Sequence, residues 1–173
     1  MRKHETKKSI SFRIEPGILE KLGKAAKEDH TTLNSFVNQV LSDHAYWDRP
    51  AKTAGWILMK QEIVRSMLDS LSQNEIRKIA LGSAKEVMKD TLLAMTGKYD
   101  LETWLAVTRY RSTRSGFHYQ QTSRDNKVSI IIKHGLGLKW SMFHKWYYLQ
   151  MIKDLGRSAT CDYTDKTIVI NIR

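Results

Sequence analysis

A single predicted strand near the start of the chain constrains the fold more than any other feature. Residues 9–14, SISFRI, alternate small polar or basic side chains with apolar ones, and the alternation stops at the Glu-Pro-Gly that follows. This period of two is typical of a strand with one buried face. Two helix-like segments come next, and no second strand is predicted within the first hundred residues. Because a strand needs a hydrogen-bonded neighbour, the sequence predicts that it pairs with the same strand of a second copy.

Two amphipathic helices are predicted directly after this strand. Pro16 is favoured at the first helical position, and apolar residues then recur at the spacing of one buried helix face until about residue 30. Thr32 is the predicted N-cap of the second helix. The apolar face of that helix consists of Phe36, Val37, Val40 and Leu41.

Residues 8–47 resemble the ribbon-helix-helix family of DNA-binding proteins, of the Arc, MetJ and CopG type. The resemblance rests on the strand SISFRI, the break EPG, the helix ILEKLGKAAKEDH and the capped segment TTLNSFVNQVL, which follow the family's order and spacing. It implies a homodimer, or a higher even oligomer, in which two protomers intertwine and their strands form an antiparallel ribbon. Such a ribbon fits the major groove of double-stranded DNA. The implied function is sequence-specific regulation of transcription.

The resemblance also divides the strand into two faces. Ile10, Phe12 and Ile14 form the inward face of the dimer, and the other face points to the groove, where Arg13 offers a bidentate fork to guanine. The start of the second helix exposes amides at the positive end of its dipole, which suits a DNA phosphate. The predicted base contacts are Ser9, Ser11 and Arg13, and the predicted phosphate contacts are Lys7, Lys8, Thr32, Asn34 and Ser35.

A linker is predicted at residues 49–55, because the surrounding stretch DRPAKTAG has the proline, glycine and charge content of a domain boundary. It separates a first domain, residues 1–48, from a second domain, residues 56–173. Three helices open the second domain, and a β-β-α-β-β segment completes it, so the predicted fold class is α+β. The helices are expected at about residues 56–71, from the capping box SQNE at 72–75 to about residue 95, and from Asp100 to the basic RYRSTR.

Two hairpins are predicted to flank one helix in the last part of the chain. A turn at residues 125–126 and another at residues 165–166 each place the apolar side chains of their hairpin on one face. The helix between them ends at Gly156, in the C′ position. The two hairpins could share one antiparallel sheet. The aligned residues are Phe117, Tyr119, Val128, Ile130 and Ile132 in the first hairpin, and Cys161, Tyr163, Ile168, Ile170 and Ile172 in the second.

The formal net charge of +11 is unevenly distributed. Residues 51–173 hold 20 Lys and Arg against 11 Asp and Glu, so they carry +9 of the total. A surplus of this size favours an anionic partner, with nucleic acid first and an anionic membrane surface second. Arg109, Arg111 and Arg114 form a predicted auxiliary nucleic-acid patch, although such charge is also typical of a solvated face.

The histidines and the single cysteine do not predict a metal site. His118 and His134 fall on opposite faces of their hairpin, and Cys161 fits the apolar face of the last one. There is no GxSxG, P-loop or paired-acid motif, so neither catalysis nor a cofactor is predicted. The aromatic residues of the last helix leave two interpretations open, the wall of a small-molecule pocket and an ordinary core face. These residues are Trp140, Phe143, Trp146, Tyr147 and Tyr148.

A cytoplasmic regulator without membrane contact is therefore the predicted function. One cysteine excludes an intrachain disulfide and favours a reducing compartment, and no stretch approaches the roughly 18 apolar residues of a membrane span. The second domain is expected to sense a small-molecule or protein effector or to extend the assembly. Two other hypotheses stay open. One is an antitoxin-like interaction component whose ribbon mainly dimerises, and the other is an RNA-binding protein acting through the basic second domain.

Overall fold

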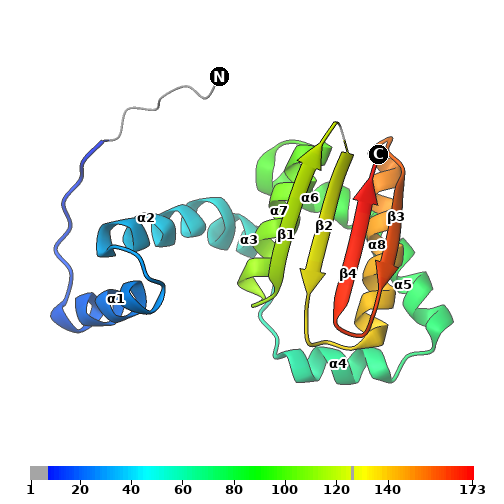
Figure 1. Cartoon of the computed structure of the whole chain (residues 1–173), viewed down its shortest axis with the longest axis horizontal. Coiled ribbons are helices and arrows are strands. Elements are labelled where there is room, and N and C mark those ends of the chain that lie inside the picture. The colour runs from blue at the N-terminus through cyan, green and yellow to red at the C-terminus, as the bar shows by residue number, and fades with distance from the viewer. Residues whose placement is uncertain (1–7, 126) are drawn as a thin grey trace. The chain divides into compact units, whose positions relative to one another are not determined.

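The chain divides into two units, residues 1–46 and residues 47–173. The structure is a computed structural model of the whole chain, and it describes residues 8–125 and 127–173. Its fold class is α+β, with helices and a four-stranded antiparallel sheet (Figure 1). Among the described residues, none of the helices combines the length and the hydropathy that crossing a membrane requires.

Two helices make up most of the described part of the first unit, α1 (Pro16–Glu28) and α2 (Leu33–Asp43). Pro16 begins α1, where its missing amide proton costs nothing. Thr32 caps α2, because its Oγ1 accepts a hydrogen bond from the Ser35 amide at 3.2 Å. Both predicted helix starts are confirmed.

The predicted strand at residues 9–14 is not formed in the single chain. Residues 8–15 have neither helix nor strand, and they run as an extended trace into α1 (Figure 1). The physical reason is the lack of a neighbour, since every strand in the described part of the chain belongs to the sheet of the second unit. The ribbon-helix-helix arrangement therefore stays a prediction.

The stretch predicted as a linker, residues 49–55, belongs instead to the second unit. It is preceded by a π-helical turn, η1 (His44–Asp48), and most of it forms a short helix, α3 (Arg49–Thr53). Trp47 and Ala51 are buried in the core of the second unit. Trp47 stacks on Tyr110 with ring centroids 6.1 Å apart. The second unit thus begins earlier than predicted, because residues distant in sequence pack against this stretch.

Two predicted caps in the second unit are confirmed. The capping box of Ser72 and Glu75 has both of its hydrogen bonds, and the Asp100 carboxylate accepts a hydrogen bond from the Thr103 amide at 2.8 Å. The helices in this part of the chain are α4 (Gln61–Asp69), α5 (Gln73–Glu86), α6 (Met88–Thr96) and α7 (Leu101–Arg114).

Two helix boundaries differ from the prediction. The helix expected from residue 56 begins only at Gln61. Gly55 has a φ of 82°, which interrupts the helical path, and the ring of Trp56 packs on that of Trp47 with the centroids 5.6 Å apart. The helix expected to reach residue 95 breaks at Val87, which separates α5 from α6. The break lets α5 pack on the helix of the β-β-α-β-β segment while α6 packs on α3 and α7.

The predicted β-β-α-β-β order is confirmed, and its four strands form one antiparallel sheet of order β1-β2-β4-β3. Tyr119 pairs with Ile132 and Tyr163 with Ile168, so both hairpins have the predicted register. Gly156, with a φ of 73°, follows the helix at the predicted C′ position. The elements are β1 (His118–Arg124), β2 (Lys127–Lys133), α8 (Leu138–Asp154), β3 (Ala159–Tyr163) and β4 (Thr167–Ile172).

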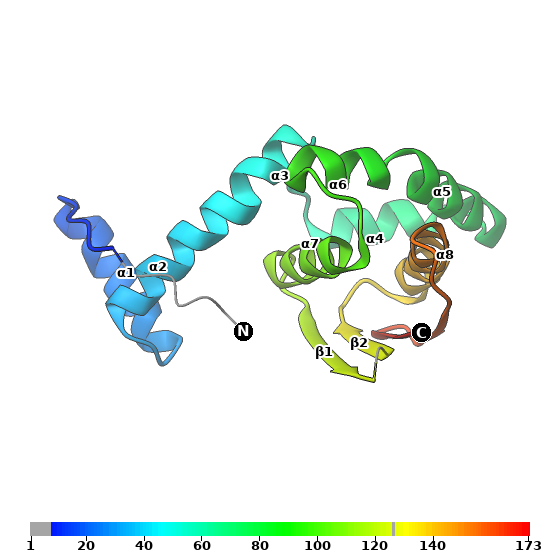
Figure 2. The same ribbon diagram turned by 90° about the horizontal axis from the view of Figure 1, so that it is seen from above.

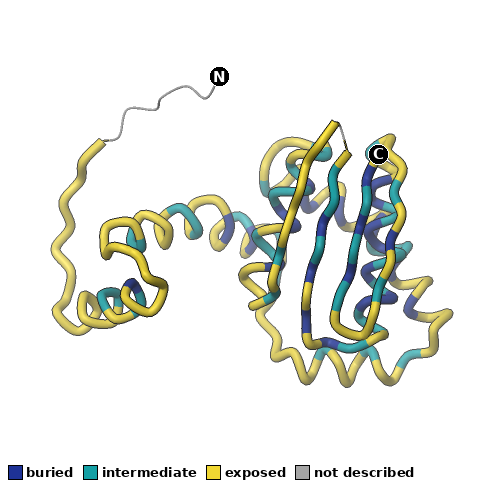
Figure 3. Tube along the Cα trace, viewed as in Figure 1, coloured by how far each residue is buried: buried dark blue, intermediate teal, exposed yellow. Residues whose placement is uncertain are grey.

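The core of the second unit lies between the sheet and its helices. Seen from above, α7 and α8 lie next to the sheet, and α5 and α6 lie beyond them (Figure 2). Buried residues concentrate on β2, β4 and α8, whereas α1 and α2 of the first unit are mostly exposed (Figure 3). The predicted apolar face of the sheet is confirmed, with Ile130, Ile132, Ile168, Ile170 and Ile172 buried.

Candidate functional site

The predicted base-contacting residues are exposed in the single chain. Ser9, Ser11 and Arg13 have exposed side chains, but so do Ile10 and Phe12, which belong to the predicted inward face. The exposed fraction is 75% for Ile10 and 56% for Phe12. Both faces of this segment are therefore exposed in the single chain, and burial does not show which face is the inward one.

The start of α2 has donors that a phosphate can accept from. The amides of Leu33 and Asn34 donate to no acceptor in the described part of the chain. The Thr32 hydroxyl donates to Ser35 Oγ at 2.9 Å, so these two side chains hold each other at the helix start. Lys8 is exposed. Lys7, the remaining predicted phosphate contact, lies outside the described residues.

The three arginines of the predicted auxiliary patch point to different surroundings. Arg109 is exposed beside Tyr110. Arg114 forms an ion pair with Asp48 at 3.0 Å, whereas Arg111 is half-buried among aromatic rings. The structure does not bring the three together on one face.

The histidines and the cysteine differ in their burial. His118 is exposed, whereas His134, His144 and Cys161 are buried. Within residues 8–125 and 127–173, no group of three or more His, Cys, Asp or Glu is placed to hold a metal ion. Burial raises the pKa of the Cys161 thiol to about 12, so this group is an uncharged core side chain.

One buried pair has the composition of a catalytic dyad but the wrong geometry. His134 Nε2 lies 2.9 Å from Ser141 Oγ, and His134 Nδ1 accepts a hydrogen bond from the Leu136 amide at 3.2 Å. The ring proton must then be on Nε2, which donates to the serine oxygen. His134 therefore offers no lone pair to deprotonate Ser141, and the pair instead fixes the turn between β2 and α8.

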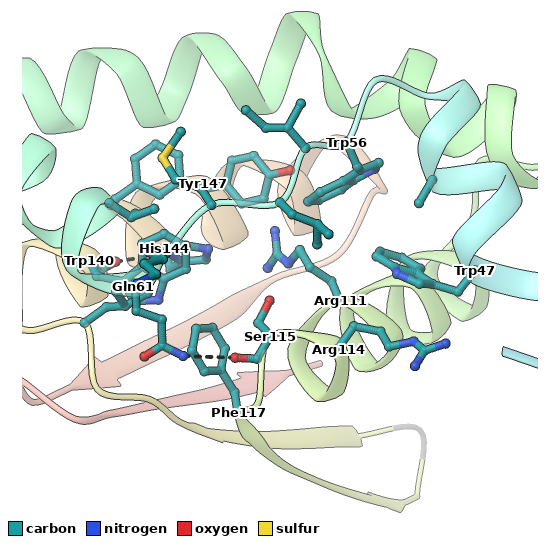
Figure 4. Close-up of a pocket in the computed structure, with 18 of the residues that line it drawn as sticks. Trp47, Trp56, Gln61, Arg111, Arg114, Ser115, Phe117, Trp140, His144 and Tyr147 are labelled. Atoms are coloured by element: carbon teal, nitrogen blue, oxygen red, sulfur yellow. Dashed lines mark hydrogen bonds between the residues drawn. The ribbon is translucent and has the colours of Figure 1, made fainter. Parts of the chain in front are cut away.

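The second unit contains a cavity of about 920 Å³ with aromatic walls. Figure 4 shows three indoles around it, from Trp47, Trp56 and Trp140, together with the rings of Phe117 and Tyr147. Trp47 belongs to η1, and Trp56 to the segment that follows α3. Trp140 and Tyr147 belong to α8, and Phe117 directly precedes β1. Gln61 and Ser115 also line the cavity, and the Gln61 side chain donates to the Ser115 carbonyl oxygen at 3.0 Å. We call this space the aromatic cavity.

Arg111 supplies the aromatic cavity with a cation. Its guanidinium donates to the Tyr148 hydroxyl and lies 5.8 Å from the ring centroid of Tyr147 and 5.9 Å from that of Trp56. Contacts of this kind orient a guanidinium over ring faces. None of the described carboxylates forms an ion pair with it.

His144 supplies the aromatic cavity with an uncharged acceptor. Burial, and then the positive charge of Arg111, hold the pKa of His144 well below its ordinary value. Its Nδ1 donates to the Trp140 carbonyl oxygen at 3.1 Å, which leaves Nε2 with a lone pair. The cavity thus combines aromatic surface, one half-buried cation and one neutral acceptor.

Sequence reasoning found part of the aromatic cavity. The choice between the wall of a small-molecule pocket and a core face stays open for the last helix. Trp140, Phe143 and Tyr147 line the cavity, and Tyr147 also belongs to the core, as does Tyr148. Trp47 and Trp56 were missed. The one available signal was their position on either side of the predicted linker, where large aromatic residues are unusual.

Comparisons with known proteins identify no relative from which a role for the site could be proposed. Neither the comparison with family models nor the search of curated proteins gives a match for this chain.

Proposed function

We propose that this chain is a homodimeric, sequence-specific DNA-binding regulator that acts without catalysis. In this proposal, residues 8–46 of two copies form the ribbon-helix-helix unit. The observation that carries it is the exposed apolar surface of the first unit. Ala26 is the one buried residue among described residues 8–46. Apart from Tyr46, eight large apolar side chains of the same segment are exposed: Ile10, Phe12, Ile14, Ile18, Leu19, Leu33, Val40 and Leu41.

The energetics of the first unit support a partner. Full burial of one large apolar side chain contributes about 1.5–3 kcal/mol, so leaving eight of them in water forgoes most of the stabilisation open to a segment of this size. Two short helices with one buried alanine form no sufficient core. A second copy supplies the missing cover and, at the same time, the missing neighbour for residues 9–14.

In the single chain, both faces of residues 9–14 are exposed. Pairing of this segment with the same segment of a second copy would bury one face and leave the other exposed. Side chains alternate along a strand, so covering Ile10, Phe12 and Ile14 turns the other set outward. Arg13 then reaches base edges in the major groove, and a bidentate contact to guanine contributes about 1–3 kcal/mol of discrimination. Ser9 and Ser11 donate or accept beside it.

Phosphate contacts would hold the ribbon in register. The amides of Leu33 and Asn34 are available at the start of α2, at the positive end of its dipole. The side chains of Asn34 and the capping pair Thr32 and Ser35 lie at the same helix start and are exposed. Lys8, with Lys7 before it, adds salt-sensitive attraction that carries no sequence information.

Two substitutions test this division of labour in fluorescence-anisotropy titrations against DNA fragments that the wild-type protein selects. Arg13→Ala should cost about 1–3 kcal/mol on selected DNA and much less on scrambled DNA. Lys8→Gln should weaken both DNAs alike and lower the salt slope by about 1 for each phosphate that the lysine neutralises.

The same titrations separate the proposal from its rivals. An Arg13→Ala protein with unchanged affinity and unchanged preference would contradict the groove assignment and favour a ribbon that only dimerises. Equal binding of single-stranded RNA by wild-type and Arg13→Ala proteins would favour an RNA-binding role for the second unit.

A further inference from the structure

We propose that the aromatic cavity binds a small organic anion, with a ring-containing apolar body and a carboxylate or phosphate group. The inference goes beyond DNA binding and does not rest on it, because every residue of the cavity belongs to residues 47–173. Such a ligand is the chemical class of effector to which the second unit would respond.

The size and walls of the cavity fit a molecule of this kind. Its volume of about 920 Å³ lies in the range of small-molecule sites, which are mostly apolar with a few placed polar groups. Trp47, Trp56 and Trp140 offer ring faces or edges, and aromatic pairs prefer offset or edge-on contacts with a flat partner. An aromatic body therefore matches these walls.

The charge of the lining selects an anion. Four cations, Lys52, Lys60, Arg111 and Arg114, line the cavity against one carboxylate, Asp48, so the lining carries a net charge of +3 with His144 neutral. Asp48 is already paired with Arg114 at 3.0 Å. The cationic surplus thus resides on Arg111 and the two lysines.

Arg111 is the group that would anchor the anion. It is half-buried, and its surroundings are ring faces and a tyrosine hydroxyl rather than a carboxylate. A desolvated guanidinium gains most from a charged acceptor, and its planar fork matches a carboxylate or phosphate with two parallel hydrogen bonds. Figure 4 shows its side chain directed into the space between Trp56 and Tyr147.

The mouth of the cavity supports an apolar ligand body. Ile57, Leu58 and Met59 line it, yet all three are exposed, Leu58 at 102% and Ile57 at 76%. Consecutive apolar side chains in water are costly unless something covers them. A ligand whose anion reaches Arg111 would lay its rings against this segment.

The test compares a matched pair of probes on the intact chain by isothermal titration calorimetry. The pair is naphthaleneacetate and its neutral amide, which have the same ring system and nearly the same shape. Because hydrogen bonds to charged groups contribute about 1.5–3 kcal/mol, the acid should bind roughly 10- to 100-fold more tightly than the amide. Equal affinities, or no saturable binding of the acid at millimolar concentration, would overturn the proposal.

Variants place the anion at Arg111. Arg111→Gln should remove most of the difference between acid and amide, whereas Arg109→Gln, on the same helix but outside the cavity lining, should keep it. Thermal unfolding shows whether Arg111→Gln is folded. If it is not, the exposed rim residue Lys60 replaces it, and Lys60→Gln should reduce acid binding several-fold without changing amide binding. Unchanged acid binding in the folded variant would contradict the assignment.

Discussion

Replacing Phe12 with alanine should dissociate the dimer on which the proposed function depends. Phe12 is 56% exposed in the single chain. A phenylalanine side chain buries about 200 Å² when fully covered, so pairing with a second copy can cover about 110 Å² of it. At about 25 cal/mol per Å² this area contributes about 3 kcal/mol per copy.

The expected effect on the dimer is smaller than this area suggests. Both copies lose the side chain, but alanine keeps its β-carbon, and the dissociated chain covers part of the area by itself. We therefore expect about half of the two-copy total, or about 3 kcal/mol, which weakens the dimer roughly 100-fold.

Sedimentation equilibrium over a range of concentrations measures this change. Ser11→Ala is the matched control, because it alters the neighbouring residue on the face assigned to DNA and should leave the dimer dissociation constant within about twofold of wild type. Identical dissociation constants for Phe12→Ala, Ser11→Ala and wild type would refute the assignment of the inward face, as would a wild-type protein that is monomeric at the highest concentration.

Two further predictions concern the second unit. Because His144 is held neutral when folded, the unfolded chain binds a proton that the folded chain lacks below about pH 6.5, so the urea-derived free energy of unfolding should fall from pH 7 to pH 5. The fall is at most about 1.4 kcal/mol per pH unit for this histidine; His144→Phe should reduce it and His118→Gln should not, and equal slopes would contradict the burial argument. Cys161, buried and with a pKa raised to about 12, should react with a thiol reagent at pH 8 only after urea is added, and rapid reaction of the native protein would be inconsistent with its place in the core.

Local signals carried most of the correct predictions. The helix starts at Pro16, Thr32, Ser72 and Asp100 depend on residues within one turn, and each is where the sequence placed it. The hairpin registers follow from the period of two and the turn position, because a slip of one residue would expose the whole apolar face. The single sheet of the second unit was only an option at the sequence level, because the register of each hairpin does not determine whether β2 pairs with β4.

Long-range packing explains what local signals missed. Trp56 leaves the helical path because Trp47 and Arg111 contact its ring, and no pattern within residues 56–71 reveals those partners. The α5–α6 break at Val87 arises because successive stretches pack on different helices. The separation of Arg109 from Arg111 and Arg114 was predictable in principle, since a helix turns by about 100° per residue. Position 109 then points about 160° away from position 111, whereas positions 111 and 114 share a face and both line the cavity.

Selection of genomic DNA fragments by the purified full-length protein, repeated with a chain that lacks residues 1–46, tests the central claim most directly. The full-length protein should enrich a limited set of fragments that share a two-fold symmetric motif, as a symmetric ribbon requires, and the shortened chain should enrich none of them. Recovery of the same fragments by the shortened chain, or no sequence enrichment by the full-length protein, would contradict the claim that a ribbon formed by residues 9–14 of two copies recognises DNA.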